Sequence, residues 1–279
     1  FNSIIHSENS ILLNLTTRQL AMKSPRSKSW FANIHLLFQK YKLPSLFDTL
    51  SDKPGKDKLK ITIKRAVHSY WTEVLQSECT GKTTLRYLHI PSLTTKKPHQ
   101  VWASVSNNLQ DVKRAHIKAK LLTDTYMLQS HSAKFDRDSN ETDALCKLCL
   151  LQPEDRQHFI LECAALHDAR TLNLTRIKEL VAAKCSVTTW KKISSDTDLL
   201  LTLILDSSSL KPILHLKKPD CDQLEKFSRL LCYNLHDARS RLMSNLQNKG
   251  KSRDGSRETH SIETKKKCAS LNEGMSMEE

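Results

Sequence analysis

Apolar residues recur at spacings of three and four in several parts of the chain, which places them on one face of an α-helix. Segments predicted to be helices span residues 29–44, 59–78, 107–123, 165–182, 196–207 and 222–247. The repeat is clearest in the last segment, where it consists of Leu224, Phe227, Leu231, Leu235, Ala238 and Leu242. Leu and Lys are abundant and the chain has only five Gly, a composition that favours helices over tight hairpins. The protein is therefore predicted to be mainly α-helical.

Two of these predicted helices, 59–78 and 107–123, carry basic residues away from their apolar face. The inward face predicted for 107–123 consists of Leu109, Val112, His116 and Ala119. The face predicted for 29–44 consists of Trp30, Ile34, Leu37, Phe38 and Tyr41. The candidate phosphate contacts, which lie away from the apolar positions of 59–78 and 107–123, are Lys60, Lys64, Arg65, Lys113, Arg114, Lys118 and Lys120. The alternative is that these cations form solvated helix faces, as Lys-rich faces usually do.

Charge, hydropathy and cysteine content indicate which partners, compartment and cysteine chemistry to expect for this protein. Lys and Arg outnumber Asp and Glu by 44 to 30, a net charge of +14 that favours polyanionic partners, of which nucleic acid is the commonest. The longest apolar run, at 199–205, falls short of the roughly 18 to 20 residues that cross a bilayer. The amino-terminal sequence has no secretory pattern, so we expect a protein of the nucleus or cytoplasm. Its eight cysteines are then expected to be thiols or metal ligands rather than disulfides.

One group of cysteines has the spacing of a metal site. Cys146 and Cys149 form a C-x-x-C pair, followed after eight residues by His158 and after four more by Cys163. Three thiolates and one imidazole are a preferred donor set of Zn²⁺, and structural zinc sites use all four positions. Soft thiolates disfavour Mg²⁺ and Ca²⁺. The spacing therefore predicts one structural zinc ion without an open coordination position, and simple burial of the thiols is the alternative.

The second half of this motif does not fit a regular helix. His158 and Cys163 are five residues apart, so on an α-helix they would point about 140° away from each other. We therefore expect the helix to start, end or be distorted between them. His167, four residues after Cys163, is a reserve ligand, and Asp155 is expected near a helix amino terminus. Cys221, Cys232 and His236 have no second C-x-x-C nearby and are expected in the core or at the surface.

The stretch CKLCLLQPEDRQHFILECAAL at 146–166 resembles the zinc knuckle that follows the reverse transcriptase domain in non-LTR retrotransposon proteins. The positions that match are Cys146, Cys149, Glu154, His158, Phe159, Ile160, Leu161 and Cys163. Flanking blocks such as SWFANIHLLFQKYKLPS and LCYNLHDARSRLM are similar to the helical region around that knuckle in invertebrate elements. The resemblance covers most of residues 29–245 in scattered blocks.

The sequence departs from this family at several points. Leu150 stands where the family usually has Gly, and Ala164 where it has Pro. The Asp-Asp pair of the polymerase signature does not occur in the sequence, and neither does the family's endonuclease constellation. The resemblance therefore implies the region after the polymerase and no enzymatic activity. Because the chain starts at Phe1, we expect a fragment whose upstream polymerase region is a partner.

Four parts are predicted along the chain. They are a basic helical region at 1–140, a zinc knuckle at 141–170, a second helical region at 171–247 and a tail at 248–279. The tail is expected to be disordered because it has almost no bulky apolar residues. The expected function is a non-catalytic part of a retrotransposon protein that contacts template RNA or target DNA, without a membrane or small-molecule partner. The alternatives are a zinc-stabilised protein-interaction module and a decayed element fragment without activity.

Overall fold

The structure of the protein is a computed structural model. It describes the backbone of residues 1–24, 26–135 and 143–272, and the side chains of these ranges up to residue 248. These residues are mainly helical, and the extended pairing among them is limited to one bridge between Leu145 and Pro153. The prediction of a mainly α-helical protein is confirmed. None of the helices in the described ranges combines the length and the apolar character that a bilayer crossing requires.

The chain folds into two compact units. The first consists of residues 1–82 and 89–99, and the second of residues 83–88 together with the chain from Gln100 onward. The predicted boundary at residue 140 is not a division between the units. Buried residues between Ala115 and Leu128 share one hydrophobic core with Cys146, Phe159 and Cys163, so the knuckle belongs to the same unit as the helix that precedes it.

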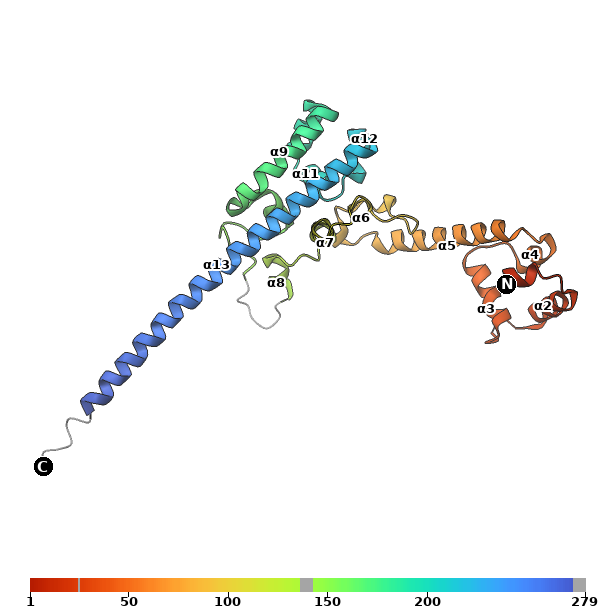
Figure 1. The fold of residues 1–279 in the computed structure, drawn as a ribbon, viewed down its shortest axis with the longest axis horizontal. Coiled ribbons are helices and arrows are strands. Elements are labelled where there is room, and N and C mark those ends of the chain that lie inside the picture. Colours follow the sequence, from red (N-terminus) through yellow and green to blue (C-terminus); the bar gives the residue numbers. More distant parts are fainter. Residues whose placement is uncertain (25, 136–142, 273–279) are drawn as a thin grey trace. The chain divides into compact units, whose positions relative to one another are not determined.

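The first unit is a group of short helices against one long helix (Figure 1). Its elements are α1 (Asn2–Ile5), α2 (Ser10–Met22), α3 (Trp30–Lys40), α4 (Leu46–Asp52), α5 (Lys56–Cys79) and the 3-10 turn η2 (Ile90–Ser92). Its core is small, with Ile5, Leu50 and Leu59 as its buried members. Of the face predicted for α3, Phe38 is buried but Trp30 and Leu37 remain 45 % and 48 % exposed. That prediction was therefore right only in part.

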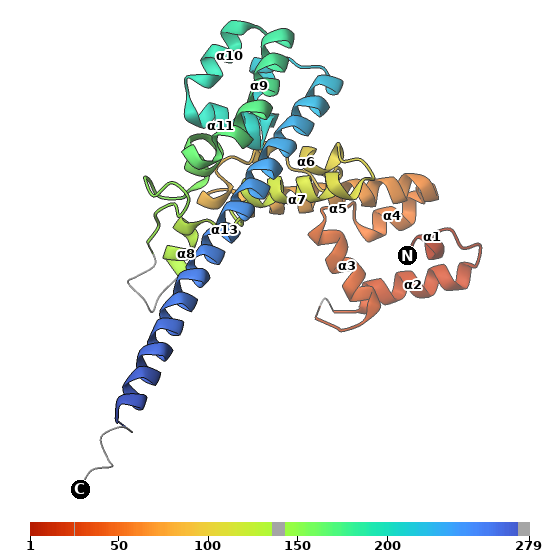
Figure 2. The ribbon, with the colours of Figure 1, turned by 60° about the vertical axis from the view of Figure 1, so that its left-hand side comes forward.

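The second unit is arranged around α13 (Lys218–Asn272), which packs mainly on α9 (His167–Lys184) and α7 (Leu109–Leu122) (Figure 2). Its other elements are η1 (Thr83–Leu85), α6 (Gln100–Ala103), α8 (Gln129–Phe135), the π-helical turn η3 (His158–Glu162), η4 (Ala164–Leu166), α10 (Val187–Ser194), α11 (Thr197–Leu205), η5 (Ser207–Leu210) and α12 (Lys211–Leu214). Leu224, Leu231 and Leu235 of the predicted repeat are fully buried. Asp196 caps α11 by accepting hydrogen bonds from the backbone N–H groups of Asp198 and Leu199 in its first turn.

Helix α7 exists where it was predicted, but its inward face was predicted wrongly. Leu109 is 67 % exposed and His116 is exposed, whereas Lys118 is completely buried. The Lys118 ammonium lies 2.7 Å from both carboxylate oxygens of Glu225 and 2.9 Å from the Ser228 hydroxyl on α13. A pattern that counts only apolar residues misses this face, because a charge can be buried when it is paired and hydrogen-bonded.

Helix α13 continues past the predicted end at residue 247. Its backbone runs on to Asn272, into the segment whose composition predicts disorder. Residues 273–279 of that tail lie outside the described residues. The disorder of the tail therefore stays a prediction.

Candidate metal centre

The four predicted ligands come together in the second unit. The donor atoms of Cys146, Cys149, His158 and Cys163 all lie within 4.8 Å of one another. The Cys149 Sγ is 3.3 Å from the His158 Nε2, and the Cys146 Sγ is 3.9 Å from the Cys163 Sγ. Cys146, His158 and Cys163 are buried and Cys149 is half-buried. This group could hold one metal ion.

A tight turn brings the first two ligands into place. The Cys146 N–H donates to the carbonyl of Gln152 at 2.8 Å, and the Leu150 N–H donates to the carbonyl of Cys146 at 2.8 Å. Leu150 has a φ of 57°, in the left-handed region where a side chain is unfavourable and Gly is the usual residue. The turn therefore keeps a glycine-like backbone although the sequence places Leu there.

A π-helical turn brings the other two ligands together. Its closing hydrogen bond runs from the Cys163 N–H to the His158 carbonyl at 2.8 Å, five residues back. A five-residue repeat is wider than that of an α-helix, so residues five apart return to the same side. The distortion expected between His158 and Cys163 is thus a π turn. Asp155 caps it, as predicted, by accepting a hydrogen bond from the His158 N–H at 2.8 Å.

Arg170 on α9 holds the end of this turn. Its Nε donates to the carbonyl of Ile160 at 2.8 Å, and one Nη donates to the carbonyl of Cys163 at 2.9 Å. The side chain is buried. Two carbonyls at the end of the turn therefore accept hydrogen bonds from α9, and the Cys163 carbonyl also accepts one from the Leu166 N–H at 3.2 Å, which fixes the direction in which Cys163 leaves the turn.

Burial controls the protonation of the thiols. Burial, reinforced by the nearby Cys146, raises the pKa of Cys163 to about 12, and burial also raises the pKa of Cys146. At Cys149 burial acts in the same direction, but hydrogen bonds to the thiolate, led by the Leu151 N–H, outweigh it and lower the pKa. Without an ion, two of the thiols stay protonated at neutral pH. Because only thiolates bind metals, ion binding must release their protons.

A buried ion pair docks the knuckle onto the helical core. Glu154 accepts two hydrogen bonds from the Arg239 guanidinium of α13, both at 2.7 Å. It also accepts one from the Gln129 N–H at 2.9 Å. Beside this pair, Tyr126 stacks on Phe159 with ring centroids 5.4 Å apart. The spacing of cysteines does not reveal this attachment, since Arg239 lies 85 residues from Glu154 in the sequence.

Comparisons with family models, curated proteins and solved structures find no match for this chain. The resemblance to retrotransposon proteins stays an expectation that rests on the residues quoted for it.

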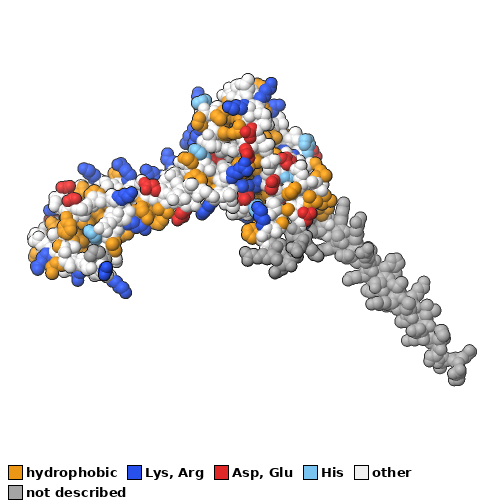
Figure 3. All heavy atoms as spheres, turned by 180° about the vertical axis from the view of Figure 1, so that it is seen from behind, with side chains coloured by type: hydrophobic (Ala, Val, Ile, Leu, Met, Phe, Trp, Pro, Cys, Tyr) orange, Lys and Arg blue, Asp and Glu red, His pale blue; other side chains and the backbone are white. Residues whose placement is uncertain are grey.

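The remaining predicted site residues have mixed outcomes. His167 is exposed and lies outside the group of four ligands, where its ring is 3.4 Å from the Thr171 hydroxyl. The candidate phosphate contacts are divided between the two units: Lys60, Lys64 and Arg65 are exposed on α5, Lys113 is exposed on α7, and Arg114 and Lys120 are half-buried. Lys118 was predicted wrongly, because its complete burial keeps it from any phosphate. On the face shown in Figure 3, Lys and Arg side chains are spread over both units among apolar ones.

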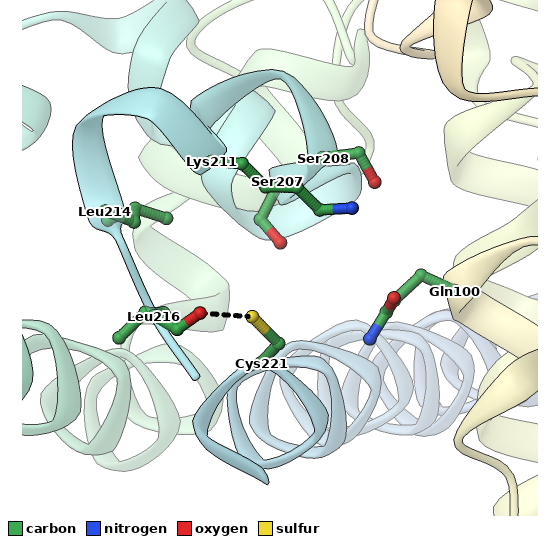
Figure 4. A pocket seen from close by; sticks show the side chains of 7 residues that line it. All are labelled: Gln100, Ser207, Ser208, Lys211, Leu214, Leu216 and Cys221. Atoms are coloured by element: carbon green, nitrogen blue, oxygen red, sulfur yellow. Dashed lines mark hydrogen bonds between the residues drawn. The ribbon is translucent and has the colours of Figure 1, made fainter. Parts of the chain in front are cut away.

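Three other cysteines, Cys185, Cys221 and Cys232, have thiols that are buried or bonded to the backbone. Cys221 faces a cavity of about 10 Å³ (Figure 4), where its thiol donates to the carbonyl of Leu216 at 3.7 Å. Cys185 also donates to a backbone carbonyl, at 3.0 Å. Cys232 is completely buried, and burial raises its pKa to about 12. His236 is bound by a tyrosine hydroxyl at 2.8 Å. Core placement is thus confirmed for Cys232, and within the described ranges no second group of potential ligands accompanies these residues.

Proposed function

We propose that the chain is a non-catalytic, zinc-stabilised region that binds nucleic acid, of the kind that follows the polymerase in non-LTR retrotransposon proteins. The observation that carries the proposal is the convergence of three thiols and one imidazole within 4.8 Å. This donor set selects zinc among the common biological divalent ions. The resemblance of residues 146–166 to the knuckle of that family supports the family assignment.

Two of the distances between donor atoms can be compared with those around a tetrahedral zinc ion. Bonds of about 2.3 Å to sulfur and about 2.0 Å to nitrogen place neighbouring donors about 3.5 to 3.8 Å apart. The separations of 3.3 and 3.9 Å between donor pairs lie within a few tenths of an ångström of this range. Four protein donors fill the coordination sphere, so the proposal gives zinc a structural role and no reaction.

The nucleic-acid part of the proposal rests on charge and exposure. The net charge is +14, and Lys60, Lys64, Arg65 and Lys113 are exposed on two helices. Cations that neutralise phosphates release counterions from the nucleic acid, so affinity should fall steeply with salt. A protein-interaction module is the second candidate, favoured by the exposed apolar side chains of α2, among them Ile11 at 69 % and Met22 at 74 %.

The metal part is tested by elemental analysis of the purified chain and of Cys149→Ser. We expect one zinc per chain in the wild type, loss of that zinc in the variant, and rapid amide exchange over 143–166. Cys79→Ser, at the end of α5 and not among the four ligands, is the matched control and should keep its zinc. One full equivalent of zinc in Cys149→Ser would refute the ligand set.

The nucleic-acid part is tested by fluorescence anisotropy with labelled RNA and DNA between 50 and about 200 mM salt. We expect the logarithm of the association constant to fall linearly with the logarithm of the salt concentration. Salt-independent binding, or no binding by the zinc-loaded chain, would refute this part. Recovery of soluble protein only together with an upstream polymerase segment would instead favour the interaction module.

A further inference from the structure

Two hollows lie side by side on α5 in the first unit and share Arg65. The first, of about 300 Å³, includes the rings of Tyr41 and Tyr70 in its wall. The second, of about 520 Å³, is lined by Ile61, Lys64, Arg65, His68 and Lys96. Arg65 lines both. A single side chain thus borders an aromatic hollow on one side and a basic hollow on the other.

The basic hollow is lined by cations without acidic neighbours. The side chains of Lys64, Arg65 and Lys96 form no ion pair and no hydrogen bond among the described residues. The segment that brings Lys96 to α5 is fixed in place, because the Thr95 hydroxyl donates to the His68 carbonyl at 3.1 Å. The hollow therefore presents positioned positive charge that no protein group neutralises, which suits phosphate oxygens.

The aromatic hollow has a firm wall. The rings of Tyr41 and Tyr70 lie 5.2 Å apart, edge to face, and Tyr70 contacts Trp71 in the same way at 5.3 Å. The Lys40 ammonium lies 5.0 to 5.6 Å from all three ring centroids. The same hollow is also lined by Glu73, whose carboxylate is negatively charged. Aromatic surface with one carboxylate acceptor is suited to a planar heterocycle that carries N–H donors.

We propose that the two hollows bind one unpaired nucleotide of a single-stranded nucleic acid. The base lies against Tyr41 and Tyr70, the adjoining phosphates lie at Lys64 and Lys96, and Arg65 bridges the two. Single-strand binding combines a basic track with aromatic platforms in this way, whereas the bases of a duplex are stacked and paired and cannot enter the aromatic hollow. The inference rests on the proposed function and names the form of nucleic acid and its site.

Other polyanions would use only half of this surface. An anionic lipid surface or an acidic protein would be satisfied by the basic hollow and would gain nothing from the Tyr70 side. The aromatic hollow adjoining Arg65 is therefore the reason for choosing single-stranded nucleic acid. A probe that lacks bases but keeps the phosphates separates these cases without changing the protein.

The test uses the full zinc-loaded chain and fluorescence anisotropy with three probes of equal length: a single strand, its duplex, and a strand of abasic units. We expect the single strand to bind at least about tenfold more tightly than the abasic strand, the range that stacking of one base provides. Arg65→Gln should weaken single-strand binding about tenfold and reduce the salt slope by about one. Lys23→Gln, an exposed cation of the same unit that lies outside both hollows, is the matched control.

The outcomes separate this inference from the function it rests on. Equal affinity for the abasic strand and the single strand, or preference for the duplex, would overturn the inference while nucleic-acid binding stands. An Arg65→Gln variant that binds like Lys23→Gln would overturn it as well. Absence of binding to every probe would refute the proposed function itself. Unchanged helical circular dichroism in Arg65→Gln establishes that a loss of affinity is not a loss of fold.

Discussion

Replacing Arg239 by Met should destabilise the second unit strongly, because it leaves a buried carboxylate without its partner. Glu154 has 2 % of its surface exposed, and the guanidinium supplies two hydrogen bonds of 2.7 Å to it. After the substitution only the Gln129 N–H remains as a donor to this carboxylate. Removing one member of a buried pair costs about 3 to 5 kcal/mol, and the remaining hydrogen bond places our expectation at about 3 kcal/mol.

The cost should depend on the charge of Glu154 and not on the lost contacts of Arg239 alone. In the double variant Glu154→Gln with Arg239→Met, no buried charge remains, so much of the loss should be recovered. The matched control is Arg241→Met, two residues further along α13. Its ion pair with Asp237 is 2.9 Å long but 72 % and 50 % exposed, and exposed pairs contribute at most about 1 kcal/mol.

The assay is urea unfolding of the zinc-saturated protein, followed by helical circular dichroism, with amide exchange over 143–166 to locate the loss. The double-variant cycle should give a coupling of about 2 kcal/mol or more. A cost below about 0.5 kcal/mol for Arg239→Met, or strictly additive variants, would contradict the idea that this pair holds the knuckle on α13.

Three further predictions follow from single side chains. Leu150→Gly should stabilise the zinc-loaded protein by about 1 kcal/mol, since it relieves a left-handed backbone and removes a side chain that is 67 % exposed; a lower midpoint in urea would contradict this. Lys118→Met should cost about 3 kcal/mol by orphaning Glu225, yet it should leave RNA affinity in anisotropy unchanged, because the side chain is buried. Burial lowers the pKa of His236 in the folded protein below its value in the unfolded chain. The contribution of the neutral imidazole to the free energy of unfolding is therefore complete above about pH 6.5, and it is lost as the pH falls from that value towards the folded pKa. His236→Gln, which can still bond Tyr126, should therefore lose less stability than the wild type between pH 7.5 and about 5.5, and an equal loss would refute the assignment.

Periodicity predicts the helices of this protein well and their buried faces only in part: the face of α13 is as predicted, that of α3 partly so, and that of α7 is not. Helices were expected and occur over most of α3, α5, α7, α9, α11 and the first part of α13. The face of α7 could not be predicted, because Lys118 is buried through its pairing with Glu225, 107 residues away. A sequence pattern records the charge of a residue but not the partner that a distant helix brings to it.

At the candidate metal site too, the sequence predicts local features but not the contacts that distant helices supply. The four ligands follow from spacing, because donor types and short loops are local properties. The π turn that aligns His158 with Cys163 was expected only as some distortion of the helix. Its supports, Arg170 on the Cys163 carbonyl and Arg239 on Glu154, come from other helices. Local chemistry is therefore visible in the sequence, whereas the contacts that orient it depend on the tertiary fold.

A closed metal site also determines where nucleic acid can be contacted under the proposed function. An ion with four protein donors has no coordination position left for a phosphate oxygen, so the metal can shape the second unit but cannot itself hold the ligand. Positive charge without internal partners must supply that contact. On α7, burial removes Lys118 from the set of available cations, whereas Lys64 and Arg65 on α5 are exposed and unpaired, and Arg65 also borders the hollow of Tyr41 and Tyr70. Under the proposed function, the chemistry of recognition is therefore expected in the first unit, and the metal is expected to maintain the fold of the second.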